Sequence, residues 1–124
     1  MGIGSGMGTG LAAGFVEARL YPRYKLDVEI QVYARNREVV RGHTVDISES
    51  GISAMLREEI RLDEIVRLEF TLPDGDVEIH ATVRQRNAFR YGFQFLESSG
   101  PHDLIQRTCR GLAIEQSLRQ PSTA

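Results

Sequence analysis

The sequence predicts an all-β protein, a six-stranded antiparallel β-barrel with one C-terminal α-helix packed against it. Two observations predict this fold. Apolar residues occupy every second position in several segments along the middle of the chain, as they do in strands with one buried face. Short turn sequences containing Asn, Asp, Pro or Gly separate these segments, as expected between adjacent antiparallel strands. Closure into a barrel removes the exposed edges that an open sheet would keep.

The six expected strands follow one another with short connections. In the first strand, Leu26, Val28 and Ile30 share one face and polar residues lie between them. The expected strands are residues 26–34, 39–47, 52–56, 66–72, 77–84 and 89–95. The turn sequences are residues 35–37, 73–75 and 86–88.

A helix is expected after the last strand. Residues 98–103, Ser-Ser-Gly-Pro-His-Asp, offer a serine cap, a proline suited to a first helical turn and an acid near the positive end of the helix dipole. Gly111 weakens the middle of this helix and Pro121 ends it. The apolar residues that recur at helical spacing are Leu104, Ile105, Cys109 and Leu112.

Length and composition indicate a single domain. A chain of 124 residues, 41% hydrophobic and 26% charged, forms one small globular unit, which we place at residues 17–118. Six of the 12 glycines fall before residue 15, so we expect residues 1–16 to form a flexible segment, and residues 119–124 to form a tail. Met7 is an alternative start, which would leave residues 1–6 outside the native protein.

The same composition excludes several classes of protein. The chain has no run of 18 apolar residues, so no membrane span and no membrane partner are expected. Its net charge of -2 argues against a nucleic-acid polymer as partner, because such binding needs an excess of positive charge. A single cysteine permits no internal disulfide and a secretory signal is not expected, so we expect the protein in the reducing cytoplasm.

Enzyme chemistry finds little support in the sequence. The histidines His43, His80 and His102 fall in different elements and form no spacing suited to a metal site or a nucleophile pair. Cys109 lies on the apolar face of the expected helix, where a small buried side chain is favoured over a reactive thiol. The sequence therefore predicts no enzyme, no catalytic residue, no metal and no cofactor.

Two short motifs stand out from this background. Arg19 and Arg23 lie four residues apart just before the first strand, a spacing that other arginine pairs of the chain share. Residues 46–51, Asp-Ile-Ser-Glu-Ser-Gly, lie where the second strand meets the third. Chance gives the pattern Asp-x-Ser-x-x-Gly on the order of 0.04 times in this composition, so this motif is the more specific of the two. Together around a first hairpin they indicate a binding site.

With these motifs the chain resembles the PilZ domain family over about residues 17–112. That family carries Arg-x-x-x-Arg before its barrel and Asp/Asn-x-Ser-x-x-Gly on it, and residues 91–95, Tyr-Gly-Phe-Gln-Phe, look like a strand near the end of its barrel. Such domains are six-stranded barrels that bind the bacterial second messenger cyclic di-GMP. Many members carry another arginine where this chain has Ala18, so we expect one ligand per domain. The resemblance implies these ligand contacts: Arg19, Arg23, Asp46, Ser48 and Gly51.

These residue types suit a ligand with two phosphates and two guanines. An arginine fork can donate two hydrogen bonds to phosphate oxygens or to guanine O6 and N7, or it can stack on a base. The Asp46 carboxylate can accept hydrogen bonds from N1 and N2 of guanine. Ser48 can bond a guanine or hold its turn, and Gly51 lets the backbone approach the ligand closely. Arg84, on the polar face of its strand, is a weaker candidate for the same surface.

The function implied is a cyclic di-GMP receptor whose 19–23 segment becomes ordered over the ligand and signals to a downstream partner protein. The alternative is a barrel of the same fold that binds no ligand and acts as a protein-protein adaptor. Each motif also has a plainer interpretation: solvated arginines, a turn cap at Asp46 and Ser48, and a bulge at Gly51. A nucleic-acid barrel of the OB type is disfavoured, because most strand aromatics, Phe89 among them, share the inward register.

Overall fold

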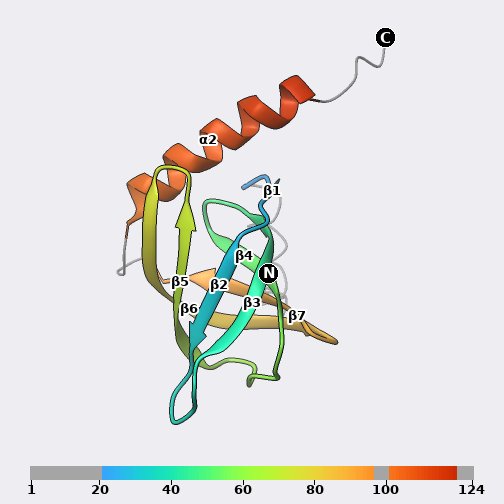
Figure 1. Cartoon of the computed structure of the whole chain (residues 1–124), viewed down its shortest axis with the longest axis vertical. Coiled ribbons are helices and arrows are strands. Elements are labelled where there is room, and N and C mark those ends of the chain that lie inside the picture. Colours follow the sequence, from blue (N-terminus) through green and yellow to red (C-terminus); the bar gives the residue numbers. More distant parts are fainter. Residues whose placement is uncertain (1–20, 97–100, 120–124) are drawn as a thin grey trace, which may run out of the picture.

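The computed structural model describes residues 21–96 and 101–119. Within these residues the chain forms a β-barrel followed by a long helix (Figure 1). The expected segment 1–16, and all but the first residue of the expected tail 119–124, lie outside the described residues. The elements are β1 (Tyr24–Lys25), β2 (Glu29–Tyr33), β3 (Val40–Ile47), β4 (Gly51–Leu56), β5 (Ile65–Leu72), β6 (Gly75–Asn87), β7 (Arg90–Phe95) and α2 (His102–Arg119).

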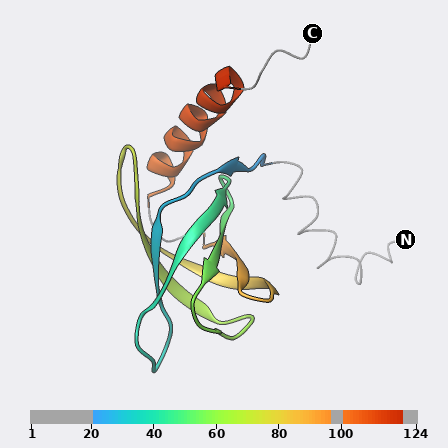
Figure 2. The same ribbon diagram turned by 45° about the vertical axis from the view of Figure 1, so that its right-hand side comes forward.

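Six of the strands close into an antiparallel barrel, which confirms the predicted fold. Around the barrel the order is β3, β2, β5, β6, β7 and β4, and β4 pairs back onto β3 (Figures 1 and 2). The two-residue strand β1 lies outside this ring and pairs with the end of β3, with Tyr24 opposite Ile47 and Lys25 opposite Asp46. Closure leaves each of the six barrel strands with a partner on both sides.

The strand predicted at residues 26–34 is interrupted at its start. β2 begins only at Glu29. Before it, two backbone hydrogen bonds, from Leu26 N–H to the Val45 carbonyl and from Thr44 N–H to the Val28 carbonyl, still join the segment to β3, and the side chain of Thr44 adds to them. Its hydroxyl accepts a hydrogen bond from the Val28 N–H at 2.9 Å and donates to the carbonyl of Leu26. Thr44 is itself 4% exposed, so this buried hydroxyl is satisfied by backbone groups.

Alternate residues of the barrel strands point inward and form the core. Val32, Leu68 and Val83 are fully buried, and complete burial of a side chain of this kind stabilises the fold by about 1.5–3 kcal/mol. The expectation that Phe89 shares the inward register is wrong. β7 begins at Arg90, and Phe89 is 45% exposed in the turn that follows Ala88, whose φ of 58° reverses the chain.

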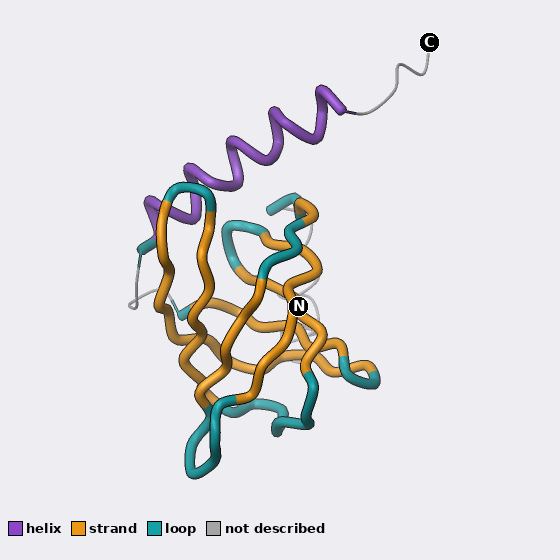
Figure 3. Tube along the Cα trace, in the orientation of Figure 1, coloured by secondary structure: helices purple, strands orange, loops and turns teal. Residues whose placement is uncertain are grey.

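The helix α2 covers one end of the barrel, beside the turn between β5 and β6 (Figure 3). As predicted, Ile105, Cys109 and Leu112 are buried on the barrel side of the helix. Gly111 does not interrupt α2, which runs unbroken from His102 to Arg119. The side chain of Gln116 bonds both backbone groups of Lys25, accepting from its N–H at 3.2 Å and donating to its carbonyl at 2.8 Å. These bonds tie α2 to β1.

Candidate functional site

A β-bulge turns Asp46 toward the outside of the barrel. The buried positions of β3 alternate up to Thr44, so uninterrupted alternation would also bury Asp46. The register with β4 shifts between Thr44 and Asp46, which places Asp46 opposite Ser53 and Ile47 opposite the core residue Ile52. One extra residue in a strand exchanges the two faces for everything that follows it. The bulge thus presents the carboxylate of Asp46 on the outer surface.

Three donors hold the carboxylate of Asp46. Ser53 Oγ and Arg23 Nε both donate to its Oδ1, at 2.7 and 2.8 Å. Arg90 Nη2 donates to its Oδ2 at 3.3 Å. The Asp46 side chain is 18% exposed, against 36% for Arg23 and 50% for Arg90. We call these four residues the Asp46 cluster.

The Asp46 cluster carries more positive than negative charge. Two guanidinium groups share one carboxylate, so one positive charge is left over. A guanidinium has five N–H donors, and each bond to Asp46 uses only one of them. Partly exposed ion pairs of this kind contribute about 0–1 kcal/mol each to stability. An arginine that exchanges the Asp46 carboxylate for another anion therefore loses little stability. The cluster is therefore suited to an anionic ligand with hydrogen-bond donors of its own.

Ser48 is placed differently from the other predicted contacts. It is fully buried, and its Oγ accepts hydrogen bonds from the N–H groups of Gly51 and Ser50 at 3.1 and 3.2 Å. These bonds close the turn between β3 and β4. Of the two roles considered for Ser48, bonding a guanine or holding its turn, these contacts correspond to the second. Ser48 thus fixes the end of β3, two residues beyond Asp46.

Gly51 also has a clear packing role. A Cβ at this position would lie 2.3 Å from the carbonyl oxygen of Phe93 on β7, closer than real contacts allow. Only glycine lets β4 and β7 approach each other this closely at the start of β4. The close backbone approach seen here is therefore to a neighbouring strand.

Of the two remaining predicted residues, Arg84 lies apart from the Asp46 cluster and Arg19 lies outside the described residues. Arg84 sits at the bulge of β6 and donates from Nε to Gln94 Oε1 at 2.7 Å. Ser53 and Arg90 were missed from the sequence. A serine and an arginine on strand faces carry no local signal. Pairing of β3 with β4 places Ser53 opposite Asp46, and pairing of β4 with β7 brings Arg90 to the same place.

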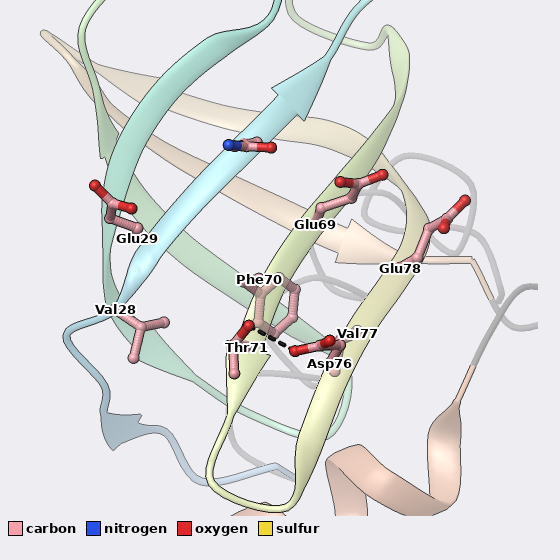
Figure 4. Close-up of a pocket in the computed structure, with 9 residues that line it drawn as sticks. Val28, Glu29, Glu69, Phe70, Thr71, Asp76, Val77 and Glu78 are labelled. Atoms are coloured by element: carbon pink, nitrogen blue, oxygen red, sulfur yellow. Dashed lines mark hydrogen bonds between the residues drawn. The ribbon is translucent and has the colours of Figure 1, made fainter.

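A shallow hollow on another side of the barrel has the opposite chemistry (Figure 4). It lies over β2, β5 and β6 and contains none of the predicted site residues. Four carboxylates line it: Glu29, Glu69, Asp76 and Glu78. Asp76 accepts a hydrogen bond from Thr71 at 2.7 Å, as Figure 4 shows. A surface with this excess of negative charge repels a ligand that carries phosphates.

Within the described residues, no group of three or more His, Cys, Asp or Glu side chains could hold a metal ion. Cys109 is 2% exposed, and its burial raises the pKa of the thiol to about 11, so it stays protonated at neutral pH. No helix in the described part of the chain is long and apolar enough to cross a membrane.

The family model of the PilZ domain matches residues 17–111. This match covers most of the chain, including the barrel and the first part of α2. The chain belongs to the PilZ domain family. The comparison with curated proteins gave no match.

Solved structures with the same fold come from bacterial proteins. The inhibitor of motility MotI/DgrA of Bacillus subtilis has a TM-score of 0.67 at 20% identity, over 82% of this chain and 52% of that one. The PilZ domain of YcgR from Escherichia coli, solved with c-di-GMP, has a TM-score of 0.65 at 19% identity, over 81% of this chain and 97% of that one. The present chain thus spans about half the length of MotI/DgrA and nearly all of the isolated YcgR domain. At these identities the likeness establishes the fold.

Proposed function

We propose that this protein is a receptor for cyclic di-GMP, without enzymatic activity, and that the ligand binds at the Asp46 cluster. The observation that carries the proposal is the outward carboxylate of Asp46 between the guanidinium groups of Arg23 and Arg90. Membership of the PilZ domain family supports the choice of ligand, because the related domain of YcgR was solved with c-di-GMP. The matching motif residues are Arg19, Arg23, Asp46, Ser48 and Gly51.

The cluster offers complementary groups for both parts of the ligand. Guanine presents N1–H and N2–H donors on one edge, which the carboxylate of Asp46 can accept. The phosphates present oxygens that the forked guanidinium groups of Arg19 and Arg23 can bind in pairs. Ser48 and Gly51 act here by fixing the turn and the strand approach that keep Asp46 in place.

A path for signal output starts at the same site. Arg23 bonds Asp46 directly before β1, and Lys25 of β1 is tied to Gln116 of α2 through two hydrogen bonds. We propose that residues 19–23 become ordered over the ligand, and that β1 passes this change to α2. A downstream partner protein would bind the surface made by the ordered segment and the barrel. Such a receptor would act in the cytoplasm.

Calorimetric titration of cyclic di-GMP into the purified protein tests the proposal. We expect a dissociation constant in the micromolar range or tighter, which corresponds to about -8 kcal/mol or better. GTP and cyclic di-AMP serve as controls and should bind at least tenfold more weakly. No heat and no competition at high ligand concentration would overturn the receptor function. The ligand-free protein adaptor would then become the first alternative.

Hydrogen exchange with and without cyclic di-GMP tests the ordering step. Amides of residues 19–25 should exchange more slowly in the complex, because ordering and hydrogen bonding protect them. A Gln116→Ala variant should keep its ligand affinity, but the ligand should no longer slow amide exchange in α2. Equal protection of residues 19–25 with and without bound ligand would contradict the ordering step, while leaving binding itself in place.

A further inference from the structure

We propose that Arg90 is a ligand-binding residue of this site, which leaves Asp46 when cyclic di-GMP binds and takes a phosphate of the ligand. This inference rests on the proposed function and goes beyond the residues that the sequence motifs contain. Arg90 is the first residue of β7, on the outer face, where it lies opposite Met55 of β4. It reaches Asp46 from a strand that neither motif includes.

The capacity of the carboxylate argues for such an exchange. A carboxylate has about four acceptor positions, and Ser53, Arg23 and Arg90 already fill three of those on Asp46. A guanine edge brings two further donors, so one present donor has to leave. Arg90 makes the longest of the three bonds, 3.3 Å against 2.7 and 2.8 Å. It is also the more exposed of the two arginines, so it can turn away at the least cost.

The charges of the complex argue for the new partner of Arg90. Cyclic di-GMP brings two negative charges to a cluster in which Asp46 already carries one. Arg19 and Arg23 can compensate only two of these three charges, and Arg90 compensates the third. A guanidinium freed from a carboxylate keeps its fork and can bind a phosphate through two parallel hydrogen bonds. The ligand thus exchanges ion pairs within the site, and no charge is left without a partner.

The test compares two arginines of the same hairpin. Arg90→Ala should weaken cyclic di-GMP binding about 10- to 100-fold, as expected for loss of hydrogen bonds to a charged group. Arg86→Ala is the matched control, because it removes the same charge from the partner strand β6. Arg86 pairs with Glu59 at 2.8 Å, and the structure gives it no bond to Asp46. Equal thermal midpoints of the two variants would show that both are folded.

A double-mutant cycle separates a ligand contact from an effect through Asp46. Asp46→Asn removes the charge that holds Arg90 but keeps an acceptor oxygen. If Arg90 binds phosphate, Arg90→Ala costs at least tenfold in affinity in the Asp46→Asn background as well. If Arg90 only positions Asp46, the cost disappears in that background and the inference is overturned.

The remaining outcomes distinguish this inference from the proposed function. Binding by the wild type with equal affinity for Arg90→Ala and Arg86→Ala would overturn the role of Arg90 alone. Absence of binding by the wild type would overturn the receptor function and the inference with it. Loss of binding in Arg90→Ala, in both backgrounds and not in Arg86→Ala, would establish Arg90 as a third ligand-binding arginine.

Discussion

Two charged clusters lie on different outer faces of the barrel, and their surplus charges have opposite signs. In the Asp46 cluster one carboxylate is shared by Arg23 and Arg90. On the face formed by β2, β5 and β6, one guanidinium, that of Arg67, lies 3.4 Å from Glu69 and 3.8 Å from Glu78. It also stacks 4.2 Å above the ring of Tyr33. We call this second group, Tyr33, Arg67, Glu69 and Glu78, the Arg67 cluster.

The difference shows that an ion-pair network by itself does not mark a binding site. Both clusters lie on the outer surface of the barrel and pair guanidinium groups with carboxylates. The Asp46 cluster has a positive charge left over, whereas the Arg67 cluster has a negative one and borders the acidic hollow of Figure 4. Only the first can exchange an internal carboxylate for a ligand phosphate. The sign of the surplus charge, rather than the number of pairs, separates a candidate site from a structural surface.

The largest expected difference in ligand affinity is between variants that each lack one arginine, from the Asp46 cluster or from the Arg67 cluster. Arg23→Ala should lower the affinity for cyclic di-GMP about 100-fold or more, because it removes a charge-assisted donor to the ligand. Arg67→Ala removes the same charge from the other face and should leave the affinity unchanged. Calorimetry on both variants measures the difference. A comparable loss in Arg67→Ala would mean that the ligand responds to the overall charge of the protein.

The next effect concerns the carboxylates. Asp46→Ala should reduce discrimination between cyclic di-GMP and cyclic di-AMP about 10-fold or more, since the acceptor for the guanine N1 and N2 donors is lost. Glu69→Ala, the corresponding change in the Arg67 cluster, should leave this ratio unchanged. Competition titrations with the two dinucleotides give the ratio directly. An unaltered ratio in Asp46→Ala would show that guanine is recognised elsewhere.

A smaller effect separates packing from ligand contact at the glycines near the Asp46 cluster. Gly51→Ala should destabilise the fold by about 1–3 kcal/mol, because its Cβ would lie 2.3 Å from a backbone oxygen of β7 and force a shift. Gly92→Ala meets only the side chain of Gln85 at 3.4 Å and should fold with nearly wild-type stability. Urea unfolding measures both. Weak binding by a Gly51→Ala protein of undiminished stability would instead make Gly51 a ligand contact.

The smallest expected effect concerns the thiol of Cys109, on the buried face of α2. Burial raises the pKa of Cys109 from 9.0 to about 11, the carboxylate of Glu49 adds to the rise, and the guanidinium of Arg23 opposes it. The folded state therefore keeps this proton to higher pH than the unfolded state does. Its contribution to stability is complete below pH 9.0 and is lost as the pH rises toward about 11.

Cys109→Ala tests this alkaline loss. The free energy of unfolding of the wild type should fall more steeply over that pH range than that of the variant, as measured by urea titrations at several pH values. The comparison of slopes removes the contribution of groups that titrate in both proteins. Parallel slopes would mean that the thiol is hydrated in the folded protein, so that α2 does not seal this end of the barrel.

Much of the fold could be predicted from residues that lie close together in the sequence. Alternation along residues 66–72 and 77–84 predicted β5 and β6, and the apolar spacing from Leu104 to Leu112 predicted the buried face of α2. Alternation reports burial only while the register is unbroken. It failed at Phe89, because Ala88 before it has a left-handed backbone conformation that turns the chain. It also does not reveal the bulge that brings Asp46 to the surface.

The sequence by itself determined the architecture and the two motifs, because strand periodicity, turn residues and short spacings are local properties. The tertiary structure decided which groups meet at Asp46. Ser53 and Arg90 join it from β4 and β7 because barrel closure and one bulge set their register. It also decided that Ser48 is a buried turn residue and that Gly51 lies against a backbone carbonyl. Pairing between distant strands has no local sequence signal, since it depends on the summed packing of the whole barrel.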